Sequence, residues 1–190
     1  MEDFYFEGET YDRKNFSENN LTIGTYEDCT FINCNFANSD LTETKFLSTV
    51  FKNCDLSMST VRDTAFRSVQ FQQCNLLGIH FDDCNDLLLE MNFGACNLQL
   101  CSFFKKSLKR TSFKDCNLQE VDFAECDLSD AVFAGCNLNA AIFEKTNLTN
   151  ADLSTAIGFI IDPEINKITK AKFSVNGLAG LLSKYGIEII

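Results

Sequence analysis

The chain has 190 residues, a net charge of −11, 45% hydrophobic residues, ten cysteines and one histidine. Its length and hydrophobic content are sufficient for one continuous core. The negative charge disfavours direct binding to nucleic acid, which depends on lysine and arginine neutralising phosphates. The cysteines form no C-x-x-C turn, so they lack the usual spacing of a zinc site.

The first residues, MEDFYFEGETYDRKNF, are acidic where a secretion signal would need a basic start and then an apolar run. No stretch of the sequence approaches the length of a membrane span. We therefore expect a cytoplasmic protein that binds no membrane.

A large apolar residue recurs at every fifth position and marks the centre of a repeating unit. The position two residues before a centre holds a small or medium side chain, and the other three positions are mostly polar. This period fits neither an α-helix, at roughly 3.6 residues per turn, nor a flat strand, at roughly two. We infer two inward and three outward positions in each unit. The centres are Phe6, Tyr11, Phe16, Leu21, Tyr26, Phe31, Phe36, Leu41, Phe46, Phe51, Leu56, Val61, Phe66, Phe71, Leu76 and Phe81, then, after a slip of two residues, Leu88, Phe93, Leu98, Phe103, Leu108, Phe113, Leu118, Phe123, Leu128, Phe133, Leu138, Phe143, Leu148 and Leu153.

Units such as CNLQE, CDLSD, CNLNA and ADLST resemble the A(D/N)LXX motif of the pentapeptide-repeat family. The resemblance covers residues 6 to 157. It implies an all-β fold, a right-handed quadrilateral β-helix in which four units make one coil. We expect this β-helix over residues 1–157 and a C-terminal cap or dimerisation element, with an α-helix and a short terminal strand, over residues 158–190.

With four units in a coil, residues twenty apart should stack, and two columns test this. Both columns continue across the slip, so we interpret Asp86 and Leu87 as a small bulge at one corner. Leu87 and Leu89 should then point outward beside Phe104 and form an apolar contact site. The alternative is that the inserted residues fold back and cover each other. The columns are Cys34, Cys54, Cys74, Cys96, Cys116 and Cys136, and Phe31, Phe51, Phe71, Phe93, Phe113 and Phe133.

Cysteine at the small inward position should pack as a small hydrophobe. Stacked cysteines would lie about 4.8 Å apart, which approaches the Cα separation of a disulfide. A stacked pair need not orient its Cβ atoms for a bond, however. We predict free thiols in a reducing compartment, with no metal and no cofactor.

The period ends at Gly158, and the segment that follows contains the only proline, Pro163, which indicates a departure from the coil. VNGLAGLLSKYG then has helical spacing, and IEII is typical of a short strand. An open solenoid end needs a cap or a partner, and the apolar tail favours a homodimer. The predicted dimerisation residues are Leu178, Leu181, Leu182, Tyr185, Ile187, Ile189 and Ile190.

The tail LAGLLSKYGIEII resembles the terminal helix and strand of the Qnr quinolone-resistance proteins, and GFIIDPEINKITKAKF is similar to a stretch of their microcin-immunity relatives. CDLSMSTVRDTAF and LLGIHFDDC also resemble Qnr segments. In those relatives the tail joins two coils into a rod that binds DNA gyrase or topoisomerase IV and imitates duplex DNA. Better-known Qnr proteins carry longer projecting loops, whereas this chain inserts two residues. The resemblance implies a homodimer and a topoisomerase partner.

Outward carboxylates concentrate on one predicted face, built on Leu41, Val61, Phe81, Phe103, Phe123 and Phe143, whereas the face built on Phe31, Phe51 and Phe71 is nearly neutral. About seven coils make a body about 35 Å long, which as duplex DNA would carry about twenty charges. The charge of this chain is about half of that, enough to steer it toward a basic groove. The alternative is that the carboxylates only keep the β-helix soluble. They are Asp40, Glu43, Asp63, Asp82, Asp83, Asp122, Glu125 and Glu144, against Arg62, Lys105 and Lys145.

The sequence favours a binding protein over an enzyme, because it has no catalytic or phosphate-binding motif and a convex column offers no concave site. His80 beside Asp82 and Asp83 is best interpreted as part of a solvated face. Two functions remain. One is a DNA-mimicking partner of a type II topoisomerase that confers resistance to an inhibitor. The other is a general interaction scaffold that binds another protein through the bulge or an asparagine-lined face.

Overall fold

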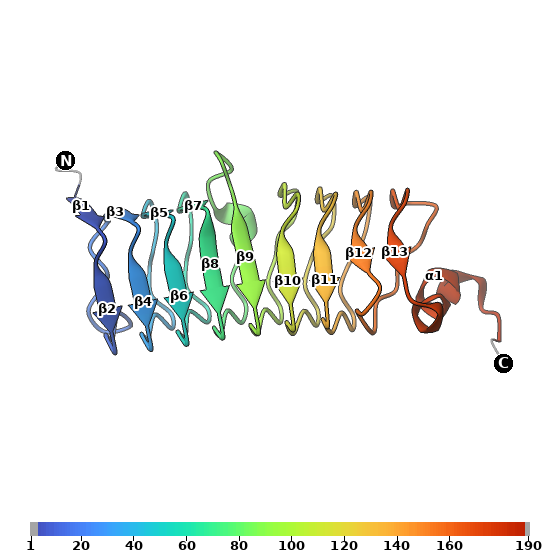
Figure 1. Ribbon diagram of the computed structural model, residues 1–190, viewed down its shortest axis with the longest axis horizontal. Coiled ribbons are helices and arrows are strands. Elements are labelled where there is room, and N and C mark those ends of the chain that lie inside the picture. The colour runs from blue at the N-terminus through green and yellow to red at the C-terminus, as the bar shows by residue number, and fades with distance from the viewer. Residues whose placement is uncertain (1–3, 189–190) are drawn as a thin grey trace.

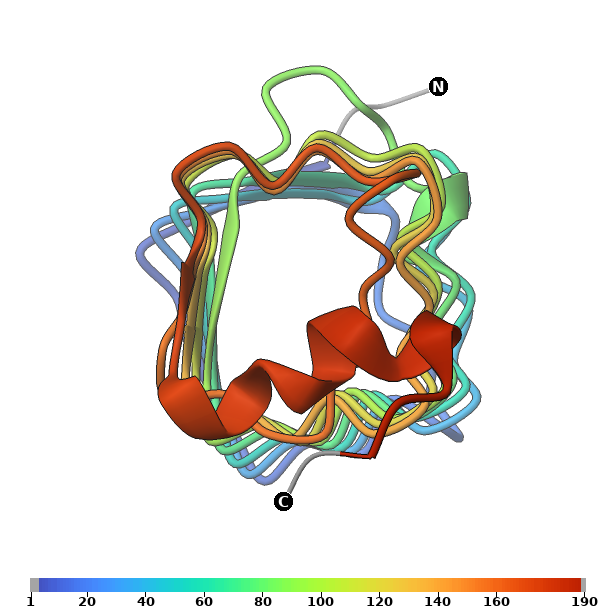
Figure 2. The same cartoon turned by 90° about the vertical axis from the view of Figure 1, so that its right-hand side faces the viewer.

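The five-residue units stack into a four-sided column, and the computed structural model describes residues 4–188 of it (Figure 1). Viewed from the C-terminal end, the chain runs counter-clockwise toward the viewer around the four walls, so the coil is right-handed (Figure 2). Parallel strands form a four-stranded sheet, in the order β1-β3-β5-β7, and a nine-stranded sheet, in the order β13-β12-β11-β10-β9-β8-β6-β4-β2. The predicted quadrilateral β-helix is thereby confirmed.

Every regular element is short, because each wall turns a corner after one unit. The strands are β1 (Phe4–Glu7), β2 (Thr10–Asp12), β3 (Gly24–Glu27), β4 (Thr30–Ile32), β5 (Lys45–Leu47), β6 (Val50–Lys52), β7 (Ala65–Arg67), β8 (Val69–Gln72), β9 (Met91–Gly94), β10 (Ser112–Lys114), β11 (Val132–Ala134), β12 (Asp152–Leu153) and β13 (Lys172–Phe173). The helices are the 3-10 turns η1 (Phe81–Asp83), η2 (Val175–Gly177) and η3 (Ser183–Tyr185) and the α-helix α1 (Ala179–Leu182).

The corners explain the period. The residue two positions after most centres has a positive φ, for example 54° at Asn33, 63° at Glu43 and 52° at Asn53. This left-handed conformation suits asparagine, aspartate and glycine better than other residues, and it turns the chain into the next wall. Asparagine and aspartate at the corners favour this turn, and the coil also imposes it on apolar residues such as Met58 and Leu100.

The predicted columns are confirmed by the strand register. Phe31 pairs with Phe51, Phe51 with Phe71, and Phe71 with Phe93 across the slip. The rings of Phe71 and Phe93 stack at a centroid distance of 5.3 Å, and those of Phe93 and Phe113 at 5.1 Å. The core is thus one continuous stack of aromatic and leucine side chains along the axis.

The small inward position has a polar role that packing alone does not predict. The Cys74 thiol donates to the Phe51 carbonyl at 3.4 Å, and the Thr64 hydroxyl donates to the Leu41 carbonyl at 2.8 Å. Each of these side chains therefore satisfies the carbonyl of a centre in the coil before it. All ten cysteines are buried free thiols, and burial raises the pKa of Cys101 and Cys126 to about 12.

The slip forms a projecting loop, and here the structure corrects the predicted register. Asn85 still pairs with Ala65, and Met91 pairs with Val69, so the two extra residues lie between them. Leu88, predicted as an inward centre, is 69% exposed. The loop, residues 86–90, projects outward from the column (Figure 2).

The column ends in a cap. β13 pairs with β12 through Leu153 and Phe173, which continues the nine-stranded sheet beyond Gly158. The segment from η2 through α1 to η3 then crosses the end of the column (Figure 2). The predicted terminal strand does not form in residues 187–188, because the chain has left the last sheet edge; residues 189–190 lie outside the described part. Within residues 4–188, no helix has the length and apolarity that a membrane crossing requires.

Candidate functional site

The predicted acidic residues share one wall, which we call the acidic wall: Asp40, Glu43, Asp63, Asp82, Asp83, Asp122, Glu125 and Glu144. Bridges between Asp40 and Thr60 and between Ser102 and Asp122 place successive coils in register along it. Asp82 and Asp122 are half-buried and the other six are exposed. The wall is therefore a series of carboxylates held on a regular backbone.

Charges on the acidic wall are only partly compensated. Its cations are Arg62, Lys105 and Lys145, which leave it five negative charges in excess. Lys105 Nζ lies 3.7 Å from Glu125, and His80 Nδ1 lies 3.4 Å from Asp82. Hydrogen bonds from Thr42 hold the pKa of Asp40 below its ordinary value, so this carboxylate is ionised at neutral pH.

The wall on the opposite side of the column is the nine-stranded sheet (Figure 2). Its outward side chains between β4 and β8 include Asn33, Asn53, Gln70, Gln72 and Gln73, all exposed and uncharged. The negative charge of the chain is thus unequally distributed around the column, as the sequence predicts.

The predicted apolar contact site is rearranged. Leu87 is 62% exposed, as expected, but Leu89 is half-buried and packs against the core. Leu88 takes its place as the second exposed leucine. Phe104 is half-buried, with Lys105 Nζ 4.6 Å from its ring centroid. The outward apolar pair of this chain is therefore Leu87 and Leu88.

A buried lysine, which the five-residue period does not predict, holds the loop. Lys106 occupies an inward position that is threonine or cysteine in neighbouring coils, and only 6% of it is exposed. Its Nζ donates to the Cys84 carbonyl at 2.7 Å and to the Asp86 carboxylate at 2.5 Å. One coil earlier, the equivalent carbonyl, of Thr64, accepts from the backbone N–H of Asn85. Lys106 therefore supplies the donor at the place where the loop interrupts the ladder.

The sequence does contain a signal for Lys106, because the five-residue period places this charged residue at an inward position. Counted from the next centre, Leu108, position 106 is the small inward place, yet it holds a lysine. A charged residue at an inward position one coil after a slip indicates an unpaired carbonyl in the slip.

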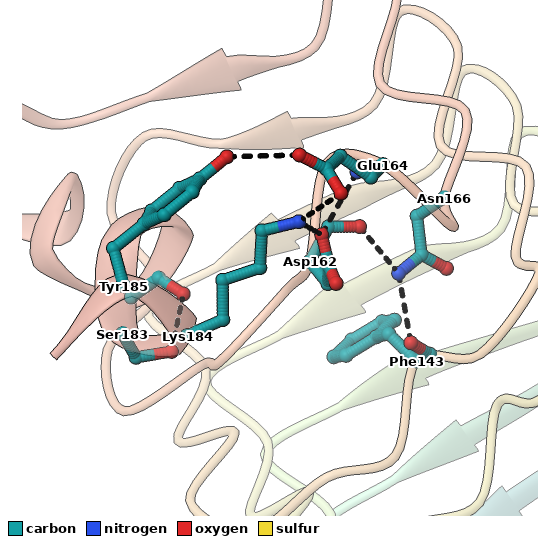
Figure 3. A network of polar contacts seen from close by, with 8 residues as sticks. Phe143, Asp162, Glu164, Asn166, Ser183, Lys184 and Tyr185 are labelled. Atoms are coloured by element: carbon teal, nitrogen blue, oxygen red, sulfur yellow. Dashed lines mark hydrogen bonds and ion pairs between the residues drawn. The ribbon is translucent and has the colours of Figure 1, made fainter.

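An ion-pair network fastens the cap. Lys184 Nζ lies 2.7 Å from Asp162 and 2.6 Å from Glu164, and the Tyr185 hydroxyl donates to Glu164 at 3.0 Å (Figure 3). The contacts of Lys184 hold the pKa of both carboxyls below their ordinary values. Beneath them the buried Asn166 amide donates to the Phe143 carbonyl at 2.8 Å. The network ties the cap to the last coil.

The predicted dimerisation residues divide between the two sides of the cap. Leu181 and Leu182 are half-buried, and Leu181 packs against the core. Leu178, Tyr185 and Ile187 are exposed by 45%, 54% and 55%. Ile189 and Ile190 lie outside the described residues. The cap thus covers the column with one side and presents apolar side chains on the other.

Among residues 4–188, no three histidine, cysteine, aspartate or glutamate side chains converge in a way that could hold a metal ion. His80 and Asp82 form a pair at the surface, with 68% of the histidine side chain exposed.

The repeats match a known family, and solved structures resemble the chain over most of its length. A family model described as a pentapeptide repeat region matches residues 25–86 and 87–153, so the match divides at the loop. No curated protein matches the chain. A trypsin-treated variant of QnrB1, a plasmid-mediated fluoroquinolone resistance protein, is 23% identical over 99% of this chain and 98% of its own, with a TM-score of 0.49. Full-length QnrB1 is 20% identical over 97% and 100%, with a TM-score of 0.40. HetL, a pentapeptide repeat protein involved in heterocyst differentiation regulation in the cyanobacterium Nostoc, is 13% identical over 90% and 84%, with a TM-score of 0.33.

Proposed function

The chain belongs to the pentapeptide repeat family, and on that premise we propose that it is a non-enzymatic cytoplasmic protein that imitates duplex DNA. Its partner is a type II topoisomerase, DNA gyrase or topoisomerase IV, which it modulates or protects from inhibitors such as fluoroquinolones. The observation that carries this proposal is the acidic wall, and the resemblance of the sequence to Qnr segments supports it.

The dimensions and charge of the acidic wall suit a groove that binds DNA. Strands at about 4.8 Å spacing give the nine-stranded column a length of about 40 Å. Duplex DNA of that length carries roughly twenty or more negative charges. The acidic wall therefore has a lower density of negative charge than DNA. Such a wall steers the protein toward a basic groove and binds more weakly as salt increases.

The cap supplies a surface for dimerisation. Its exposed side includes Val175, Leu178, Tyr185 and Ile187, and Val175 is 84% exposed. Pairing two caps would bury these side chains and double the length of the acidic wall. Replacing Leu178 and Ile187 with aspartate should convert a dimer to a monomer in light-scattering measurements of the solution mass. An unchanged mass would contradict dimerisation through this side of the cap.

Supercoiling by purified gyrase, with and without ciprofloxacin, tests the topoisomerase proposal. The informative variant combines Glu43→Gln, Asp63→Asn and Asp83→Asn, all exposed on the acidic wall. We expect wild-type protein to inhibit or protect gyrase and the variant to need about tenfold more protein, because loss of charge complementarity slows association.

A matched control combines Asp28→Asn, Asp115→Asn and Glu120→Gln. These residues are exposed on the other walls and, like Glu43 and Asp63, have a positive φ. The control removes the same net charge and should act as the wild type does. Equal losses in both variants would show that only total charge matters, and no effect of the wild type on gyrase would end the proposal.

The second candidate function is a protein-interaction scaffold without a topoisomerase role. The exposed Leu87 and Leu88 favour it, because adjacent exposed leucines on a polar wall mark contact surfaces. A pull-down with the wild-type protein distinguishes the two functions, since the scaffold predicts a partner that is not a topoisomerase.

A further inference from the structure

The middle of this acidic column carries a basic band beside the loop. The segment KKSLKR, residues 105–110, holds four of the sixteen lysines and arginines of the chain in six positions. Lys105, Lys109 and Arg110 are exposed there, and Lys106 is buried beneath the loop. The local charge is thus opposite to that of the chain as a whole.

The loop itself is held in one shape. Besides the two bonds from Lys106, Arg67 Nε donates to the Leu87 carbonyl at 3.2 Å, and the Leu87 N–H donates to the Asn85 side chain at 2.9 Å. At its far end the Ser68 hydroxyl donates to Glu90 at 2.7 Å. These contacts fix the backbone on both sides of Leu87 and Leu88. A surface that is already ordered loses little entropy when it binds.

Two hollows lie beside the exposed Leu88, which lines both of them. One hollow is lined by residues that include Leu88, Leu89, Glu90, Lys109 and Arg110. The other is lined by Asp86, Leu88, Leu89, Lys105 and Ser107. Leu88 and Leu89 therefore line both hollows, and each hollow also includes at least one lysine.

The basic side chains remain available to a partner. Lys109 lies 3.2 Å from Asp127 and Lys105 lies 3.7 Å from Glu125, but about 60% of each lysine side chain is exposed. The carboxylates of the loop are already engaged, Asp86 with Lys106 and Glu90 with Ser68. Exposed ion pairs of this kind contribute little to stability, so an incoming carboxylate can compete for these lysines.

From this arrangement we propose that the loop and the basic band form a docking site for a segment of another protein that is acidic and carries apolar side chains. The apolar side chains occupy the hollows on either side of Leu88, and the carboxylates pair with Lys105, Lys109 and Arg110. This site adjoins the acidic wall at Lys105, but it does not depend on a topoisomerase partner. Nucleic acid is a poorer fit, because its phosphates would extend over Glu125 and Asp127.

The test uses a phage-displayed library of random peptides selected on the folded wild-type protein. Counter-selection uses a variant with Leu87→Ser, Leu88→Ser, Lys109→Glu and Arg110→Glu. We expect enriched peptides that combine glutamate or aspartate with leucine, phenylalanine or tryptophan. Enrichment of basic peptides, or no peptide that discriminates the two proteins, would overturn the proposal.

Fluorescence anisotropy with the most enriched peptide then separates the two contributions. Leu87→Ser with Leu88→Ser, and Lys109→Glu with Arg110→Glu, should each weaken binding at least about tenfold, the second more strongly at low salt. The matched control is Lys167→Glu with Lys170→Glu, exposed on the same wall but several coils away, and it should bind as the wild type does. Equal weakening by the control, or displacement of the peptide by duplex DNA, would overturn the assignment.

Discussion

Replacing Lys106 with methionine tests how the loop is held. Methionine retains a stem of similar length at a position where 6% of the lysine is exposed, and it removes the ammonium group. The substitution therefore changes the packing little and removes the hydrogen bonds to the Cys84 carbonyl and Asp86.

The magnitude follows from the two partners. Cys84 is buried, with 5% exposed, and a buried acceptor left without a donor costs about 1–3 kcal/mol. The Asp86 side chain is 78% exposed, so water replaces the ammonium and the loss is about 0–1 kcal/mol. Removing a buried charge works in the opposite direction. We expect a net loss of about 1–2 kcal/mol and a fall in Tm of about 2–8 °C.

Thermal unfolding gives the stability change, and hydrogen exchange measured by mass spectrometry gives its location. Exchange should accelerate in residues 86–90 and stay slow in β8 and β10. Lys109→Met is the control, because Lys109 is 59% exposed and its pairing with Asp127 is a surface contact; its Tm should change little. Wild-type stability together with unchanged exchange in the loop of the Lys106→Met protein would refute the reasoning.

Three further predictions concern the core and the cap. Phe93→Ala should cost about 3–5 kcal/mol in chemical denaturation, because the Phe93 side chain is 2% exposed and stacks on two rings; a loss below about 1 kcal/mol would mean that the column does not act as a continuous core. Because Lys184 lowers the pKa of Asp162 and Glu164, their pairing stabilises the cap at neutral pH and is lost as the pH falls below the ordinary values of 3.8 and 4.5. Cleavage of the cap of the wild-type protein by pepsin should therefore increase as the pH falls through 4.5 and 3.8. The cap of the Lys184→Met protein should be cleaved readily already at pH 4.5. Gly180→Ala should release the cap at any pH, since an added Cβ would lie 2.1 Å from a backbone oxygen; wild-type protection from trypsin would show that the cap can shift to admit it.

Much of this fold could be predicted from the sequence because its contacts repeat. The same neighbours recur one coil away, so a five-residue period, a small inward residue and a polar corner indicate the columns without a structure. The phenylalanine column illustrates this, since Phe71 and Phe93 pair across the slip as the period predicts. The acidic wall could be predicted for the same reason, because position in the period decides which wall a side chain is on.

Only the tertiary structure decided what happens where the repeat is broken. The period predicted Leu88 inside and Leu89 outside, but the loop exposes Leu88 and packs Leu89 against the core. Its shape depends on Lys106, which reaches back one coil to a carbonyl that has lost its ladder partner. The contacts of the cap could not be predicted either. Lys184 pairs with Asp162 and Glu164, which lie about one coil earlier in the sequence, but no repeated motif specifies this pairing. Periodic contacts are encoded in every unit, whereas each of these contacts occurs once and depends on where the folded backbone places its partner.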